Sequence, residues 1–225
     1  MVGVQIHAVQ TELFSRHASE LLHWNQRINL TAITDPVEVA VKHYIDSIVV
    51  GPLIPGAQTI LDIGSGGGFP GIPIKILFPD ARVTLIDAKK KKISFLKHAI
   101  RKLELQGILA RHRRAEDLAQ DITPSKKFDV VLCRALTSLA SFIAYAQPLV
   151  KDRGKIIALK GNLTSETIGQ TRKKVIRQLQ RSPNPSPAIS VLNYELPVLN
   201  LKRSIVCIDF QASGDRTYLL RHNYD

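Results

Sequence analysis

Apolar residues in the first fifty positions recur at the spacing of an α-helix. They are Leu13, Leu21, Leu22, Trp24 and Ile28. This pattern predicts a helix over residues 11–28. The pair Asp35-Pro36, with an N-capping acid before a first-turn proline, predicts a second helix that runs to about Val50. We therefore expect a helical arm over residues 1–51, packed on the rest of the chain.

From residue 58 onward, short apolar runs alternate with amphipathic segments. The expected strands are residues 59–63, 82–86, 107–110, 128–133 and 155–159, followed by 187–192 and 204–210 with a polar excursion between these two. One expected helix ends near Phe78, and three others span residues 89–104, 137–146 and 165–180. Residues 181–187 are expected to form a loop. Such alternation predicts an α/β, Rossmann-like fold with a mostly parallel, doubly wound sheet over residues 52–225.

A glycine-rich segment, residues 64–71, follows the first expected strand and opens a helix. Glycines there allow a sharp turn and the close approach of a ligand to the backbone, with Gly64 and Gly66 nearest the strand. Asp87 ends the second expected strand, where a carboxylate can bind ribose hydroxyls. The alternative is a structural turn with Asp87 as a helix N-cap.

The details of this segment bear on which nucleotide-like ligand it binds. Phe69 stands where a dinucleotide fingerprint has its third glycine, and no Gly-Lys-Ser/Thr phosphate loop is present. Asp62, just before the first glycine, suits a cationic ligand better than a pyrophosphate. These features favour S-adenosylmethionine over a nicotinamide cofactor. Ala115-Glu116 follows the third expected strand and can border an adenine, although a simple helix start explains the same residues.

Charge divides the chain unevenly. The net charge is +12, but residues 1–81 carry −3, whereas residues 82–114 carry 11 basic and two acidic side chains. Residues 151–225 carry 13 basic and six acidic side chains. Two basic blocks suggest a polyanionic partner, nucleic acid first, although a solvated basic surface is the alternative. Because no long apolar run, signal peptide or disulfide framework is evident, we expect a cytoplasmic protein without a membrane span.

Several motifs together resemble one family. They are Asn29-Leu30-Thr31, His43 with Asp46-Ser47, Asp62-Ile63-Gly64-Ser65-Gly66 running into Pro70-Gly71-Ile72-Pro73, Arg134-Ala135, and Ala158-Leu159-Lys160-Gly161. In this order they resemble the bacterial small-subunit ribosomal RNA guanine-N7 methyltransferases, the glucose-inhibited division protein B family. The resemblance covers about residues 25–161 and weakens toward Arg203. Cys133 departs from the serine that the family usually has before the Arg-Ala pair.

The resemblance implies S-adenosylmethionine contacts at Gly64, Phe69, Ala115, Glu116 and Arg134. It also implies methylation of a guanosine N7 in 16S rRNA, either in the small ribosomal subunit or in its precursor. Because N7 has a lone pair and no proton, no general base is needed, and catalysis rests on positioning. Arg134 and Lys160 are therefore the candidates for positioning the substrate.

Candidate substrate or RNA contacts are Asn29, His43, Asp46 and Arg203. His43 and Asp46 lie on one helix face, where a packing network is an equal alternative. We expect a monomer without a metal. The functional alternatives are a methyltransferase acting on another RNA or on a small molecule, a nicotinamide oxidoreductase, and an RNA-binding protein without catalysis.

Overall fold

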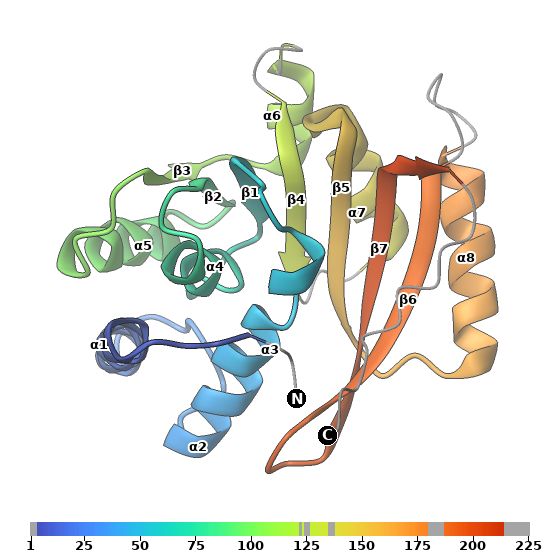
Figure 1. Ribbon diagram of the computed structural model, residues 1–225. Coiled ribbons are helices and arrows are strands. Elements are labelled where there is room, and N and C mark those ends of the chain that lie inside the picture. The colour runs from blue at the N-terminus through green and yellow to red at the C-terminus, as the bar shows by residue number, and fades with distance from the viewer. Residues whose placement is uncertain (1–3, 122, 124–126, 135–137, 180–186, 214–225) are drawn as a thin grey trace. The chain divides into compact units, whose positions relative to one another are not determined.

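The computed structural model describes residues 4–121, 123, 127–134, 138–179 and 187–213 (Figure 1). Contacts within the chain divide it between Arg114 and Ala115 into two compact units, which we describe separately. The expected boundary at residue 51 between an arm and a larger domain stays a prediction.

The described residues of the first unit form five α-helices and three strands. The helices are α1 (Ala8–Asn25), α2 (Pro36–Val39), which continues through a π-helical segment (Ala40–Ile45) into α3 (Asp46–Ile48), then α4 (Gly71–Leu77) and α5 (Lys90–Lys102). The strands are β1 (Thr59–Ile63), β2 (Arg82–Asp87) and β3 (Ile108–His112). All three run parallel in the order β3-β2-β1. Because Ile63 lies opposite Ile86, β1 and β2 end at the same edge of the sheet.

The predicted helix start at Asp35-Pro36 is confirmed by its capping, whereas the first helix spans Ala8–Asn25 and not the predicted residues 11–28. Asp35 Oδ1 accepts a hydrogen bond from the Glu38 N–H at 2.8 Å, which satisfies one of the free amides of the first turn. Lys89 is the N-cap of α5, whose apolar stripe lies buried against the sheet. The predicted strands of the first unit are also present, each to within two residues of its expected ends.

The described residues of the second unit form three α-helices and four strands. The helices are α6 (Ala115–Asp121), α7 (Leu139–Ala146) and α8 (Ser165–Leu179). The strands are β4 (Phe128–Arg134), β5 (Val150–Gly161), β6 (Pro187–Leu196) and β7 (Leu201–Ser213). β4 and β5 pair in parallel, whereas β7 pairs antiparallel with both β5 and β6.

Three strands of this unit are longer than the sequence predicts. β5 begins at Val150 rather than residue 155. The polar excursion expected between residues 192 and 204 is wrong, because β6 and β7 continue to Leu196 and from Leu201 as one hairpin. Cross-strand pairs such as Tyr194 with Arg203 hold polar residues in the ladder, where hydropathy alone gives no strand signal. Most of the loop expected at residues 181–187 lies outside the described residues.

The strand order is β3-β2-β1 in the first unit and β4-β5-β7-β6 in the second, and the pairs β1–β2, β2–β3 and β4–β5 run parallel. This arrangement confirms the expected α/β, Rossmann-like fold. Among the described residues, no helix is long and apolar enough to span a membrane.

Candidate functional site

The glycine loop between β1 and α4 is fixed by the backbone of β2. The N–H groups of Gly64 and Ser65 both donate to the carbonyl of Ile86, at 2.9 and 3.0 Å. Gly64 and Gly66 adopt φ values of 74° and 56°, a left-handed conformation that side chains disfavour. The loop therefore has the shape of a tight turn at the carboxyl edge of two parallel strands, where Rossmann-like folds bind their ligands.

Asp87 fastens this loop to the start of α5. Its Oδ2 accepts the Gly66 N–H at 3.0 Å, and its Oδ1 accepts the Lys89 N–H at 2.8 Å. The side chain is only 7% exposed. Each carboxylate oxygen accepts one of these bonds and retains a lone pair that can receive a ligand hydroxyl. The N-cap of α5 is Lys89, so Asp87 is not the helix N-cap that the sequence offered as an alternative. It links the glycine loop to the residue before α5 and keeps the capacity to bind a ribose.

Asp62 lies beneath the loop rather than on its surface. It is fully buried, and its Oδ2 accepts the N–H of Gly71, the first residue of α4, at 3.0 Å. A side chain at Gly71 would collide with Leu85 and approach this carboxylate to 2.8 Å. The Asp62 carboxylate therefore stabilises the turn through its hydrogen bond to the start of α4, and it is not exposed where it could attract a cationic ligand.

Phe69 joins the loop to the N-terminal helices through an aromatic cluster. Its ring stacks on His43, with centroids 4.6 Å apart and planes at 18°. Tyr44 meets the same ring edge-on at 5.2 Å, and His17 lies 5.3 Å from it. Phe69 is 4% exposed, so its ring packs inside the protein and is not presented to solvent.

His17 is a buried residue of this cluster that the sequence analysis did not single out. Its Nδ1 is hydrogen-bonded to the Tyr44 hydroxyl at 2.8 Å. Burial, with a smaller contribution from His43, lowers the pKa of His17 to about 3, so the ring is neutral. Burial likewise raises the pKa of Tyr44. The spacing of residues in the sequence could have identified His17, because Phe14, His17 and Leu21 are three and four positions apart and lie on the buried face of α1.

Two of the candidate substrate residues, both in the first unit, are buried in its interior. His43 and Asp46 are 7% and 5% exposed. His43 Nε2 is 2.8 Å from the Thr31 hydroxyl, and its carbonyl accepts the Ser47 hydroxyl. These contacts are those of a packing network, so a substrate role for His43 and Asp46 stays a prediction.

Asn29, the third candidate in this unit, is exposed. The segment that follows it is instead held by Asn25, a residue that the sequence analysis did not single out. Asn25 Oδ1 accepts the Leu30 and Thr31 N–H groups at 2.9 and 3.0 Å. Its amide donates to the Thr31 carbonyl at 2.9 Å. The side chain of Asn29 is therefore not used to build this turn.

In the second unit, Ala115 and Glu116 form the first turn of α6. Ala115 is buried and Glu116 is half-buried. A hydrogen bond to Glu116, together with its negative charge, raises the pKa of Tyr145, which lies on α7. Glu116 is thus hydrogen-bonded to a residue of α7. It lies in the first turn of a helix, which is the structural alternative that the sequence offered for this segment.

The remaining candidates, Arg134, Lys160 and Arg203, gather at one edge of the second unit. Arg134 ends β4 opposite Leu159, and Arg203 of β7 lies opposite Gly161. Since side chains alternate along a strand, Arg134 and Arg203 share one face, whereas Lys160 lies on the other face with Ser204. The two residues expected to position the substrate therefore do not project from the same side of the sheet. Among the described residues, no group of His, Cys, Asp or Glu can hold a metal ion.

A glycine turn after β1 and an acid at the end of β2 place the protein in the class of Rossmann-like folds that bind nucleotide-like ligands. An O-methyltransferase from Bacillus cereus, solved in complex with SAH, has the same fold with a TM-score of 0.62. That likeness covers 86% of this chain and 90% of the other, at 19% sequence identity.

The family model of rRNA small subunit methyltransferase G (GidB) matches residues 10–185, and the chain belongs to this family. The expected resemblance is confirmed and extends on both sides of residues 25–161. A ribosomal RNA small subunit methyltransferase G from Geobacter sp. (strain M21) is 42% identical over 92% of each chain. Its counterpart from Acetivibrio thermocellus is 38% identical over 92% of this chain and 83% of its own length.

Proposed function

We propose that the protein transfers a methyl group from S-adenosylmethionine to N7 of a guanosine in 16S rRNA. The observation that carries the proposal is membership of the rRNA small subunit methyltransferase G family over residues 10–185. The match covers most of the length of the relatives of this name, so nearly all of each relative has a counterpart in this chain. We further propose that it acts as a cytoplasmic monomer on the small ribosomal subunit or its precursor.

The glycine loop fits S-adenosylmethionine by its chemistry. Gly64 and Gly66 leave the loop backbone without side chains, and the Asp87 carboxylate retains lone pairs for ribose hydroxyls. In the second unit, Ala115, Glu116 and Arg134 are the contacts that the family resemblance implies. When bound, the cofactor supplies an electrophilic methyl group on a sulfonium centre.

The task of the protein's residues is to hold guanine N7 in line with that methyl group. N7 carries a lone pair and no proton, so no side chain has to remove one, and correct orientation can supply about 7–11 kcal/mol. Arg134 and Lys160 are cations that can bind the base or its phosphates, and neither is asked to act as a base. We assign Arg134, which the family resemblance also implies as a cofactor contact, to the reacting end, whereas Lys160 lies on the opposite face of the sheet.

Two measurements test the proposal. Calorimetry with S-adenosylmethionine and with NAD should detect binding of the first alone, and binding of NAD alone would overturn the cofactor assignment. Labelled methyl transfer into 16S rRNA, followed by mapping of the modified base, should place the label on a guanine N7. Label confined to another RNA, to a small molecule or to a different base atom would overturn the substrate assignment.

A further inference from the structure

Every charged side chain of α5 is a cation. Its thirteen residues, Lys90–Lys102, include five lysines and one arginine and no acid. The apolar residues of the helix are buried, and a row of polar residues lies on its other side. This row consists of Lys90, Ser94, Lys97 and Arg101, whose spacing of four, three and four residues places them on one face. All four are exposed, and we call them the α5 stripe.

The charges of α5 are unfavourable for the helix itself. Lys90 and Lys91 lie in its first turn, where the helix dipole is positive and acids, not cations, are stabilising. Lys97 and Arg101 are like charges four residues apart, an arrangement that destabilises a helix. The local structure of α5 therefore gives no reason for these cations, whereas an anionic partner does.

The acids around α5 do not neutralise the stripe. Asp87, which precedes the helix, accepts backbone N–H groups through both of its carboxylate oxygens. Glu20 of α1 lies 2.8 Å from the ring of His98, and Glu104 follows the C-terminal end of α5. Within the part of the chain that the structure describes, the cations of the stripe form no ion pair. The stripe therefore presents its positive charge to solvent.

The length and composition of the stripe narrow the class of partner. Residues 90–101 span about 16 Å of helix axis, which matches a row of phosphates better than a single small anion. The stripe has no aromatic or apolar side chain that could stack on a base or enter a membrane, and the apolar face of α5 is buried. We propose that the α5 stripe binds backbone phosphates of the rRNA substrate and orients the RNA without reading its sequence.

This inference rests on the proposed function and assigns a docking surface for the same substrate. The start of α5 lies beside the glycine loop, because Lys89 donates its N–H to Asp87 and the Lys92 ammonium is 3.6 Å from the place of a Cβ on Gly66. RNA bound along the stripe therefore passes close to the loop. The stripe should affect how tightly RNA binds, and neither the methyl-transfer step nor the affinity for S-adenosylmethionine.

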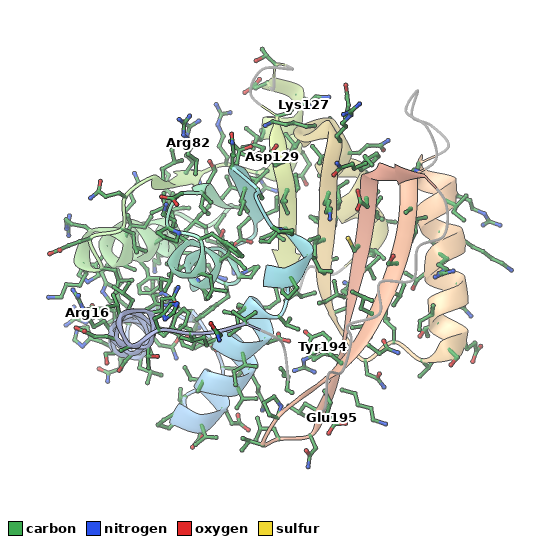
Figure 2. All side chains as sticks on the ribbon, viewed as in Figure 1. Arg16, Arg82, Lys127, Asp129, Tyr194 and Glu195 are labelled. Atoms are coloured by element: carbon green, nitrogen blue, oxygen red, sulfur yellow. The ribbon has the colours of Figure 1, made fainter. Side chains whose placement is uncertain are left out.

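Lys90→Gln/Lys97→Gln, which removes two charges and keeps good helix formers, is the primary test. The matched control is Arg82→Gln/Arg153→Gln, which removes two charges from exposed positions at the start of β2 and in β5 (Figure 2 labels Arg82). The Kd for naked 16S rRNA and for small subunits is measured between about 0.05 and 0.3 M salt.

We expect the stripe variant to bind both forms of rRNA about tenfold more weakly, or worse, at about 0.1 M salt. The slope of log K against log salt should fall by about 1.4–1.8, the share of two phosphate contacts. The KM for RNA should rise accordingly, whereas kcat at saturating RNA and the cofactor Kd from calorimetry stay unchanged. The control should match the wild type in all of these quantities.

Lys90→Glu separates RNA binding from a role in the fold. An acid in the first turn of α5 suits the helix dipole, so this variant should raise Tm by about 1–4 °C. The same variant should bind rRNA more weakly than the wild type, because it places a negative charge against phosphates. A lower Tm together with weaker RNA binding would overturn the inference, since damage to the fold would then explain the loss.

Three further outcomes have a fixed meaning. A wild-type Kd and salt slope in Lys90→Gln/Lys97→Gln would overturn the inference, and so would an equal loss in the control, because net charge alone would then explain binding. A loss for small subunits with unchanged affinity for naked rRNA would also overturn it, because the partner would then be a ribosomal protein. If the wild type transfers no methyl group to rRNA but the stripe variant shows the expected loss of binding, the proposed function fails and the docking surface stands.

Discussion

Asp87→Asn separates two roles that one side chain combines. In the folded protein, each carboxylate oxygen accepts one backbone N–H, from Gly66 at 3.0 Å and from Lys89 at 2.8 Å. Asparagine keeps one acceptor oxygen, but its NH₂ group then faces the second N–H, so two donors oppose each other. The 7% exposure of the native side chain leaves little room for water to replace the lost bond.

The structure sets the size of the two effects. A buried N–H left without an acceptor costs about 1–3 kcal/mol of folding free energy. For a chain of this size each kcal/mol lowers Tm by about 2–4 °C, so we expect a Tm lower by about 2–12 °C. Loss of a charge-assisted bond to a ribose hydroxyl costs about 1.5–3 kcal/mol, which raises the cofactor Kd by about 10-fold to 150-fold.

Thermal unfolding without cofactor and calorimetry with S-adenosylmethionine measure these effects separately. Asp152→Asn, at an exposed position of β5, is the matched control and should change neither quantity. A lower Tm with an unchanged cofactor Kd would refute the ribose contact and leave Asp87 as a structural link between the loop and the start of α5. An unchanged Tm would show that the two Asp87 hydrogen bonds, which link the loop to the start of α5, do not stabilise the fold.

Three further substitutions probe the structure around the loop. Gly71→Ala drives a methyl group into buried side chains, including that of Asp62, and should lower the free energy of unfolding in urea by about 1–3 kcal/mol; a stability equal to the wild type would show that the turn relaxes. The pKa of His17 is about 3 in the folded protein and 6.5 in the unfolded chain, so the unfolded chain takes up a proton first as the pH falls. The free energy of unfolding therefore has its full value above pH 6.5 and decreases by about 1.4 kcal/mol per pH unit below it. His17→Phe should remove that slope between pH 6.5 and 5, and an identical slope in both proteins would contradict the assignment. Lys75→Met removes a buried ammonium, whose pKa burial lowers and which donates to two carbonyls, and we expect a loss of about 2 kcal/mol in the same urea assay; unchanged stability would contradict it.

The elements that could be predicted from the sequence are those whose environment is uniform. β1 and β4 are apolar runs because both faces of a parallel sheet are buried, and α5 has the stripe of a helix covered on one side. The start of β5 and the hairpin end of β6 could not be found in this way. There, polar side chains lie in the ladder because a neighbouring strand satisfies their backbone, and the neighbour is a property of the fold.

The candidate site divides along the same line. The position of the glycine loop and of Asp87 follows from their place after strands, which sequence order determines. The bonds from Asp87 to Gly66 and Lys89 depend on two segments meeting in space, so the sequence left a cap and a ribose contact as alternatives. The opposite faces of Arg134 and Lys160 depend on strand register, which no single segment encodes.

The N-terminal helices help to shape the glycine loop and are more than an attachment to it. A side chain at Gly67 would come within 2.8 Å of Leu21 on α1, and one at Gly68 within 3.3 Å of His17. Phe69, the next residue, stacks on His43 from the helix that follows Asp35. Three consecutive loop residues are thus packed against helices formed by the first fifty residues. Because a preorganised loop loses less entropy when it binds a ligand, we expect the ligand affinity of this loop to depend on helices that lie far from it in sequence and present aromatic rings to it.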